Sequence, residues 1–205
     1  MNAAYRRGLA TDAASVAKVA ANVARADNIR LVAVDLLRSW NQTQSLDSVT
    51  GRWRPLPQRN VDGLDESIRL FVPAMLTGSQ ELRTRVVEMA TELGIRDIQP
   101  TLLTILHDTN QDEQLRLSAF KALARMADDV TAILEGGLKD PSEAIQLSAI
   151  ELITSRDPQG SIERLGQLAE SGSVRARQTA MQLLGSIPGE GTESVLLKSF
   201  EQLHK

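Results

Sequence analysis

The segment Leu115–Ala124, LRLSAFKALA, carries a pattern that recurs along the whole chain. Segments that begin at residues 29, 82, 145 and 176 align with it without gaps. Every copy has an apolar residue at its first, eighth and ninth places and a small or short residue at its fifth. These places fall on one stripe of an α-helix, so each copy predicts a helix with one buried face.

The spacing of the copies predicts the architecture. The starts at residues 82, 115, 145 and 176 lie 33, 30 and 31 residues apart, a period typical of stacked two-helix units. We therefore expect an all-α fold, a right-handed α-solenoid that forms one array over residues 1–205. The expected units are a half-repeat at 11–25 and helix pairs at 27–76, 79–108, 112–139, 142–170 and 173–203.

Polar residues mark the expected helix starts. Residues that can accept hydrogen bonds from free helix amides stand five places ahead of four copies, and we expect them to cap the first helices: Thr77, Asn110, Asp140 and Ser171. An acidic residue follows each of these four starts by 12 to 15 places and is expected to open the second helix, where it suits the helix dipole: Asp97, Asp129, Asp157 and Glu190.

This pattern, written x-D/N-x-x-x-V-R-x-x-A-A-x-A-L, resembles HEAT repeats of the short bacterial, phycobilisome-lyase-like kind over about residues 24–205. The resemblance is specific for the fold and carries no particular function. It implies a structural ladder in which the arginine at the second place pairs with an acidic turn residue. The arginines are Arg30, Arg83, Arg116 and Arg177, and the acidic residues are Asp97, Asp129 and Asp157. Gln146 stands where a fifth arginine would complete the ladder.

One insert, at residues 38–61, interrupts the period. The starts at 29 and 82 lie 53 residues apart, and the extra segment holds both tryptophans of the chain. Its candidate binding residues are Trp40, Arg52, Trp53, Arg54 and Arg59. Three interpretations remain open. Both tryptophans could pack onto the helices, which is favoured; the loop could dock a protein; or it could stack nucleic-acid bases.

The insert has a second resemblance. The stretch WNQTQSLDSVTGRWRPLP, residues 40–57, is similar to a segment of large bacterial proteins that join a sugar-dehydrogenase-like propeller, HEAT repeats and a c-type cytochrome domain. This resemblance implies a non-catalytic middle module, cut from a longer and periplasmic protein. Otherwise we expect a cytoplasmic protein. The array also begins in mid-repeat, as expected of an excised segment.

Composition narrows the chemistry. The formal charge is −3 and aromatic residues make up 3% of the chain, which disfavours a nucleic-acid-binding surface. The absence of cysteine excludes disulfides, thiolate chemistry and covalent haem attachment within this chain. The two histidines, His107 and His204, have no second ligand at helical spacing, so we expect no metal or cofactor. Neither a signal peptide nor an apolar run of membrane-spanning length is present.

We therefore expect a non-enzymatic scaffold that presents a concave face to proteins, or a spacer between neighbouring domains of the same polypeptide. The uncapped terminal helices offer a surface for self-association. The alternative is an enzyme module on a HEAT-like frame, of the DNA glycosylase or bilin lyase type. Such a glycosylase would show a basic face with an exposed aromatic residue and a carboxylate.

Overall fold

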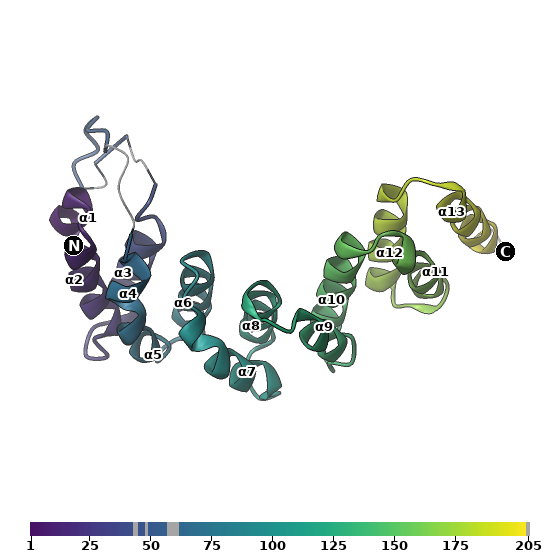
Figure 1. Cartoon of the computed structure of the whole chain (residues 1–205), viewed down its shortest axis with the longest axis horizontal. Coiled ribbons are helices and arrows are strands. Elements are labelled where there is room, and N and C mark those ends of the chain that lie inside the picture. Colours follow the sequence, from purple (N-terminus) through teal and green to yellow (C-terminus); the bar gives the residue numbers. More distant parts are fainter. Residues whose placement is uncertain (43–44, 48, 57–61, 204–205) are drawn as a thin grey trace. The chain divides into compact units, whose positions relative to one another are not determined.

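The computed structural model describes residues 1–42, 45–47, 49–56 and 62–203, and over these residues the protein is all-α (Figure 1). The predicted fold class is confirmed at this level, while the right-handed solenoid stays a prediction. The described residues contain no β-strand, only an isolated antiparallel bridge between Leu46 and Trp53. The chain divides into two compact units, Met1–Asp128 and Asp129–Lys205.

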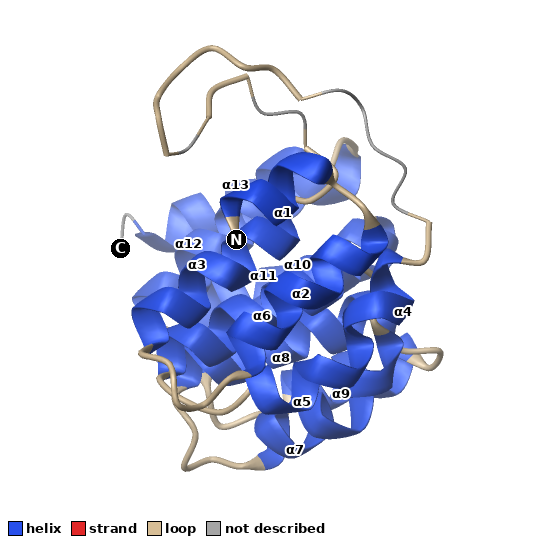
Figure 2. Cartoon of the chain, turned by 90° about the vertical axis from the view of Figure 1, so that its left-hand side faces the viewer, coloured by secondary structure: helices blue, strands red, loops and turns tan. Residues whose placement is uncertain are grey.

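The first unit is built around three helices that correspond to the first helices of the expected pairs. Helix α3 packs on α6, and α6 packs on α8. Helix α2 contacts α1, α3 and α4, and α7 contacts α8 (Figure 2). The bounds are α1 (Asn2–Arg7), α2 (Ala10–Ala21), α3 (Asp27–Arg38), α4 (Leu64–Ile68), η1 (Arg69–Phe71), α5 (Val72–Met75), α6 (Gln80–Glu92), η2 (Arg96–Ile98), α7 (Gln99–His107) and α8 (Glu113–Met126).

In the second unit the packing alternates between neighbouring helices. Helix α10 contacts α9 and α12, and α11 contacts α12 and α13. The bounds are α9 (Val130–Leu138), α10 (Glu143–Arg156), η3 (Gln159–Ser161), α11 (Ile162–Ser171), α12 (Val174–Ser186) and α13 (Glu190–Leu203). Its core cluster combines aliphatic side chains of α10, α11 and α12: Leu147, Ile150, Leu165, Ala176, Ala180 and Leu184, with Ile187 beside them. How the chain divides into repeats stays a prediction.

The apolar stripe is buried or half-buried, with one exposed exception at its N-terminal end. The half-buried residues are Leu36, Leu152, Ile153 and Leu183. All five residues at the fifth place are buried: Ala33, Val86, Ala119, Ala149 and Ala180. The first place is buried in the four later copies, but Ile29 is 38% exposed. On α3 the neighbouring Arg30 is buried instead, because its guanidinium bonds the ends of adjacent helices.

The expected helix caps were placed two residues too early. The observed caps lie three residues before each register start, and each side-chain oxygen accepts a backbone amide of the first turn: Ser79, Asp112, Ser142 and Ser173. This spacing brings the side chain within reach of the free amides. The residues predicted as caps belong to the preceding turn. The Thr77 hydroxyl donates to Ala74 O, and the Ser171 hydroxyl donates to Gln167 O.

The second helices begin close to the predicted acidic residues. Asp129 caps α9 by accepting the Ala132 amide at 3.1 Å, and Asp157 accepts the Gly160 amide at 2.9 Å at the start of η3. Asp97 lies within η2 and Glu190 is the first residue of α13. Pro73 interrupts the second helical segment of the first expected pair. It stands in the first turn of α5, after the separate pieces α4 and η1, because proline has no amide to donate.

Candidate functional site

The described part of the insert forms a tight turn around Asp47. The Asp47 carboxylate accepts the amides of Val49 and Thr50, both at 3.0 Å. The backbone of Asp47 pairs across the turn, donating to Arg52 O at 2.9 Å and accepting the Gly51 amide at 2.8 Å. Gly51 has φ +66°, a conformation that suits glycine. The turn therefore holds one defined shape around a buried carboxylate, 2% exposed.

Helix α1 anchors this turn. Arg6 lies 3.4 Å from the Asp47 carboxylate and donates a second bond to Arg54 O at 3.0 Å. Asn2 donates to the same carboxylate at 3.4 Å. The amides of Thr50 and Val49, with Arg6, hold the pKa of Asp47 below its usual value, so it is ionised at neutral pH. No sequence pattern predicts this helix, yet the loop is bonded to it.

The two tryptophans of the insert have opposite environments. Trp40 is 1% exposed and packs edge-on against Tyr5, with ring centroids 5.5 Å apart. Trp53 is 70% exposed, and Leu46, its partner in the antiparallel bridge, is 56% exposed. The interpretation that both tryptophans pack onto the helices is therefore right for Trp40 and wrong for Trp53. Tyr5 fixes the contact by donating to Ser39 O at 3.0 Å.

The arginines of the insert also differ from one another. Arg54 lies 3.5 Å from the Asp47 carboxylate, so its charge is partly balanced inside the loop. The Arg52 side chain is exposed, while its carbonyl accepts the Asp47 amide. Arg59, also predicted as a binding residue, lies outside the described residues. The described loop thus presents two arginines, Arg52 and Arg54, and one tryptophan to solvent on an anchored turn.

A pocket of about 460 Å³ opens between this loop, α1 and α3. Its lining is mainly apolar at the rim, where Met1, Val32 and Val49 are 41%, 50% and 72% exposed. Leu36, Asp35 and Ser39 supply the α3 wall. Trp53 and Leu46 are also exposed, so the described loop and the pocket beside it carry five exposed apolar side chains.

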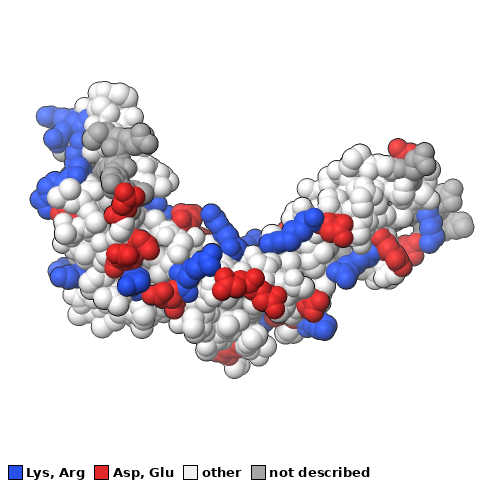
Figure 3. All heavy atoms as spheres, in the orientation of Figure 1, with Lys and Arg blue, Asp and Glu red and all other residues white. Residues whose placement is uncertain are grey.

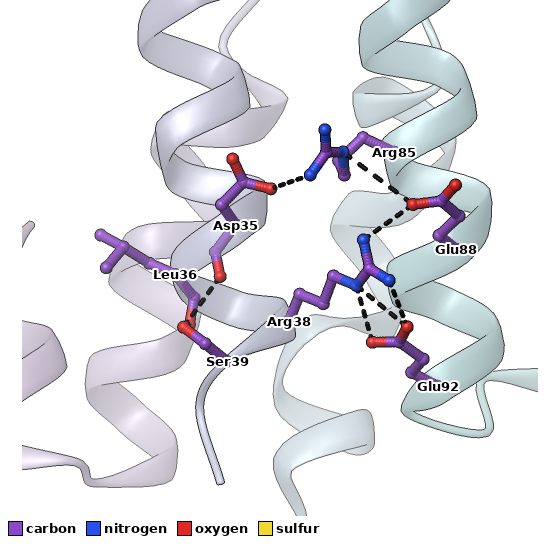
Figure 4. A network of polar contacts seen from close by, with 7 residues as sticks. All are labelled: Asp35, Leu36, Arg38, Ser39, Arg85, Glu88 and Glu92. Atoms are coloured by element: carbon purple, nitrogen blue, oxygen red, sulfur yellow. Dashed lines mark hydrogen bonds and ion pairs between the residues drawn. The ribbon is translucent and has the colours of Figure 1, made fainter. Parts of the chain in front are cut away.

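A charged network joins α3 and α6 (Figure 4). Arg38 donates to both Glu92 oxygens, at 2.6 to 2.9 Å, and to Glu88 at 2.7 Å. Arg85 bonds Asp35 at 3.0 Å and lies 3.9 Å from Glu88. The bonds to Glu92 raise the pKa of Arg38 above its ordinary value. These contacts complete the outer edge of the α3–α6 interface.

Two arginines of the predicted ladder, Arg30 and Arg116, bind backbone carbonyls. Arg30 donates to Ala20 O at 2.8 Å and to Ala74 O at 3.1 Å, and Arg116 donates to Leu106 O at 2.9 Å. The carboxylate partner of Arg30 is Asp27, at 3.1 Å, rather than a predicted aspartate. Arg83 bonds Gln111 at 2.9 Å, and the Arg177 side chain bonds no other described residue.

The predicted acidic partners serve other contacts. Asp97 lies 3.9 Å from Arg69, whereas Asp129 and Asp157 cap the helical turns that follow them. Arg30 and Arg116 therefore tie their helices to the carbonyl end of the helix before, whereas among the described residues Arg83 and Arg177 do not. Gly78 leaves room for Arg30, because a Cβ there would lie 2.8 Å from its guanidinium.

Neither charge sign dominates the visible surface. Figure 3 shows acidic and basic side chains interspersed on the face of the first unit that it presents. Among the described residues no group of three histidine or carboxylate side chains is placed to hold a metal ion, and His107 stands at the end of α7. The described helices include none that combines the length and apolar character needed to cross a membrane.

Sequence reasoning missed Tyr5, Arg6 and Asp47, which build the base of the loop. The run DSVTG, residues 47–51, is a turn signal that could have identified Asp47. Nothing local marks Tyr5 or Arg6, since their partners lie more than 30 residues away. No protein-family model matches this chain, and no curated protein is significantly similar to it.

Proposed function

We propose that this chain is a non-enzymatic protein-interaction scaffold built from stacked HEAT-type helix pairs, and that the loop at residues 45–56 is a contact for its partner. The partner is a protein surface, on a separate chain or in a neighbouring domain of the same polypeptide. One observation carries the proposal. Trp53 is 70% exposed on a turn that the buried Asp47 fastens to α1.

The energetics of such a loop favour binding. A tryptophan buries roughly 150–250 Å² when a partner covers it, and tryptophan is among the residues that most often dominate interface energies. The Asp47 turn and its bonds to α1 are formed before any partner arrives. Little ordering entropy is then lost on association, so more of the burial energy appears as affinity.

The surroundings of Trp53 favour a protein over a nucleic acid. The chain as a whole carries a charge of −3, and Asp47 partly balances the charge of Arg54. Arg52 and Arg54 are exposed beside Trp53, together with the apolar side chains of Leu46 and Val49. A loop that mixes apolar side chains with two arginines suits a partner with an apolar cleft better than a run of phosphates.

Site-specific photo-crosslinking tests the proposal. A photoreactive phenylalanine replaces Trp53 in one variant and Leu70, an 82% exposed residue of η1, in a matched control. Both are expressed in the cell that makes the protein and irradiated. We expect one discrete crosslinked protein band from position 53 that is absent from position 70. In a purified pair made with that protein, Trp53→Ala should weaken binding by about 2 kcal/mol or more.

The result that would overturn the proposal is equal crosslinking at the two positions, or none at position 53. Because both replaced side chains are exposed, neither variant should disturb folding, which circular dichroism confirms. Trp53→Phe separates ring burial from the indole N–H: retention of most of the affinity indicates apolar contact as the main term.

A further inference from the structure

Three successive helices of the first unit present the same surface. Places four, seven, eight and eleven of the repeat lie along one face of a helix, because their spacing follows the helical turn. On α3 these places are Val32, Asp35, Leu36 and Ser39; on α6 they are Arg85, Glu88, Met89 and Glu92; on α8 they are Ser118, Lys121, Ala122 and Arg125. What lies against this surface differs from helix to helix.

The chain itself closes the second of these surfaces. On α3, Met1, Asn2 and Val49 border an open pocket in which Val32 and Asp35 are exposed. On α6 the neighbour is Arg38, from place ten of α3, which bonds both Glu88 and Glu92 (Figure 4). A cation from the preceding helix thus bridges two carboxylates one helical turn apart.

On α8 the corresponding slot is open. A groove of about 260 Å³ separates α6 from α8, and Lys121 and Arg125 stand where α6 has Glu88 and Glu92. Place ten of the preceding helix is now Thr91, whose hydroxyl donates within α6 to Val87 O at 2.7 Å. Lys121 and Arg125 are exposed, and among the described residues no carboxylate lies within ion-pair distance of either.

We propose that this groove binds a carboxylate side chain of a partner protein. The inference rests on the proposed function in one respect only, that the occupant belongs to a protein. The negative charge of the expected ligand follows from the α3–α6 contact. Two glutamates of α6 bind a cation there, so a lysine and an arginine at the same places of α8 should bind an anion. Glu88 and Glu92 do not supply that anion, because Arg38 already bonds them.

The groove suits a single carboxylate better than a run of phosphates. Glu88 and Glu92 line its α6 wall and repel a continuous polyanion, whereas one carboxylate on the α8 side stays next to Lys121 and Arg125. Leu117, which is half-buried, lines the same groove and offers contact to the methylenes and apolar neighbours of a glutamate. The expected ligand is therefore an acidic residue flanked by apolar ones.

Nuclear magnetic resonance of the ¹⁵N-labelled chain tests this inference with two probe peptides. One is acetyl-Ala-Leu-Glu-Leu-Ala-amide, and the other has glutamine in place of the glutamate. We expect the glutamate peptide to shift amides of residues 88–92 and 114–125, with a dissociation constant at least tenfold below that of the glutamine peptide. Lys121→Gln with Arg125→Gln should remove this preference without introducing new charge.

A matched control variant, Lys18→Gln with Arg25→Gln, removes two exposed cations elsewhere in the same unit and should leave the preference intact. Equal binding of the two peptides would refute the inference. So would the same shifts from inorganic phosphate at equal concentration, which would indicate a general anion site. Crosslinking at position 53 is measured independently, so the loop proposal and the groove proposal can each fail while the other stands.

Discussion

The α3–α6 contact and the α6–α8 contact join helices of the same repeat, yet their outer edges differ. Both bury the same apolar stripe, with Leu82 and Val86 on α6 and Leu115 and Ala119 on α8 fully covered. At the first contact Arg38 and Arg85 engage three carboxylates. At the second, two cations face an open groove. The buried stripe is therefore common to both contacts. Their solvent-exposed edges differ, because side chains of the chain itself close the α3–α6 edge, whereas the α6–α8 edge has room for a ligand.

The largest effect should come from the buried arginine beside the closed contact. Arg30→Met removes bonds to Ala20 O, Ala74 O and Asp27, and we expect a loss of about 3 kcal/mol of unfolding free energy. Arg83→Met, at the same place on α6, should cost about 1 kcal/mol, because its described side-chain bond is to Gln111 alone. Urea unfolding followed by circular dichroism measures both. Equal losses would contradict the difference drawn between the two contacts.

The loop anchor should give the next largest effect. Asp47→Asn keeps the shape of the side chain but removes its charge from two amides and Arg6, so amide exchange at residues 49–54 should quicken about tenfold. The folded pKa of Asp47 lies below the ordinary value of 3.8. Its stabilising contribution is therefore complete above that value and is lost as the pH falls through the folded pKa.

Protection of the loop amides, corrected for the intrinsic exchange rate, should consequently decrease below about pH 4 in the natural chain and stay flat in Asp47→Asn. Because the measurement is local to residues 49–54, the lowered pKa values of Asp27 and Asp108 elsewhere do not affect it. Identical acid profiles for the two proteins would show that another group anchors the loop.

A smaller effect is expected at the Arg38 bridge. Arg38→Met should cost about 1 kcal/mol, since the bonds to Glu88 and Glu92 are charged but the side chains are about a third exposed. The loss should shrink as salt is raised, because screening weakens the pair. Lys18→Met, an exposed cation of α2, provides the comparison and should change stability by less than about 0.5 kcal/mol. If the loss of unfolding free energy in Arg38→Met does not change with salt concentration, Arg38 stabilises the protein through packing and not through its charge.

The smallest effect comes from transplanting the closed contact onto the open one. Lys121→Glu with Arg125→Glu gives α8 the two carboxylates of α6, and Thr91→Arg supplies the cation at place ten. Adding Thr91→Arg to the two glutamates should raise the free energy of unfolding by about 0.5–1 kcal/mol. The groove of this variant should no longer prefer the glutamate peptide. If Thr91→Arg gives no gain in that background, the places are not structurally equivalent.

The sequence predicted what depends on local periodicity. The stripe identified the first helices because burial on one helix face repeats every three to four residues. Asp129 lies at its predicted place at a helix start, since capping acts within one turn. The N-caps were misplaced because each turn holds two polar residues, such as Thr77 and Ser79, and composition alone does not say which one reaches the free amides.

What the sequence left open depends on contacts between distant segments. Tyr5 meets Trp40, and Arg6 meets Asp47, across more than 30 residues with no period to indicate them. The same holds for Arg38, whose partners Glu88 and Glu92 lie 50 and 54 residues away. Trp53 stays a predicted binding residue, and its exposure follows from the way Asp47 turns the chain, which no residue pattern specifies.

Because one tryptophan is buried and the other is exposed, the intrinsic fluorescence of the chain reports on two regions separately. Trp40, sealed against Tyr5, should emit at short wavelength and resist iodide, whereas Trp53 should emit at long wavelength and be quenched. The two signals are separable without any label, so one titration reads two events. A partner that covers the loop would protect only the red component, and unfolding would expose the blue one as well. Association and denaturation thus have different spectral signatures in the same cuvette.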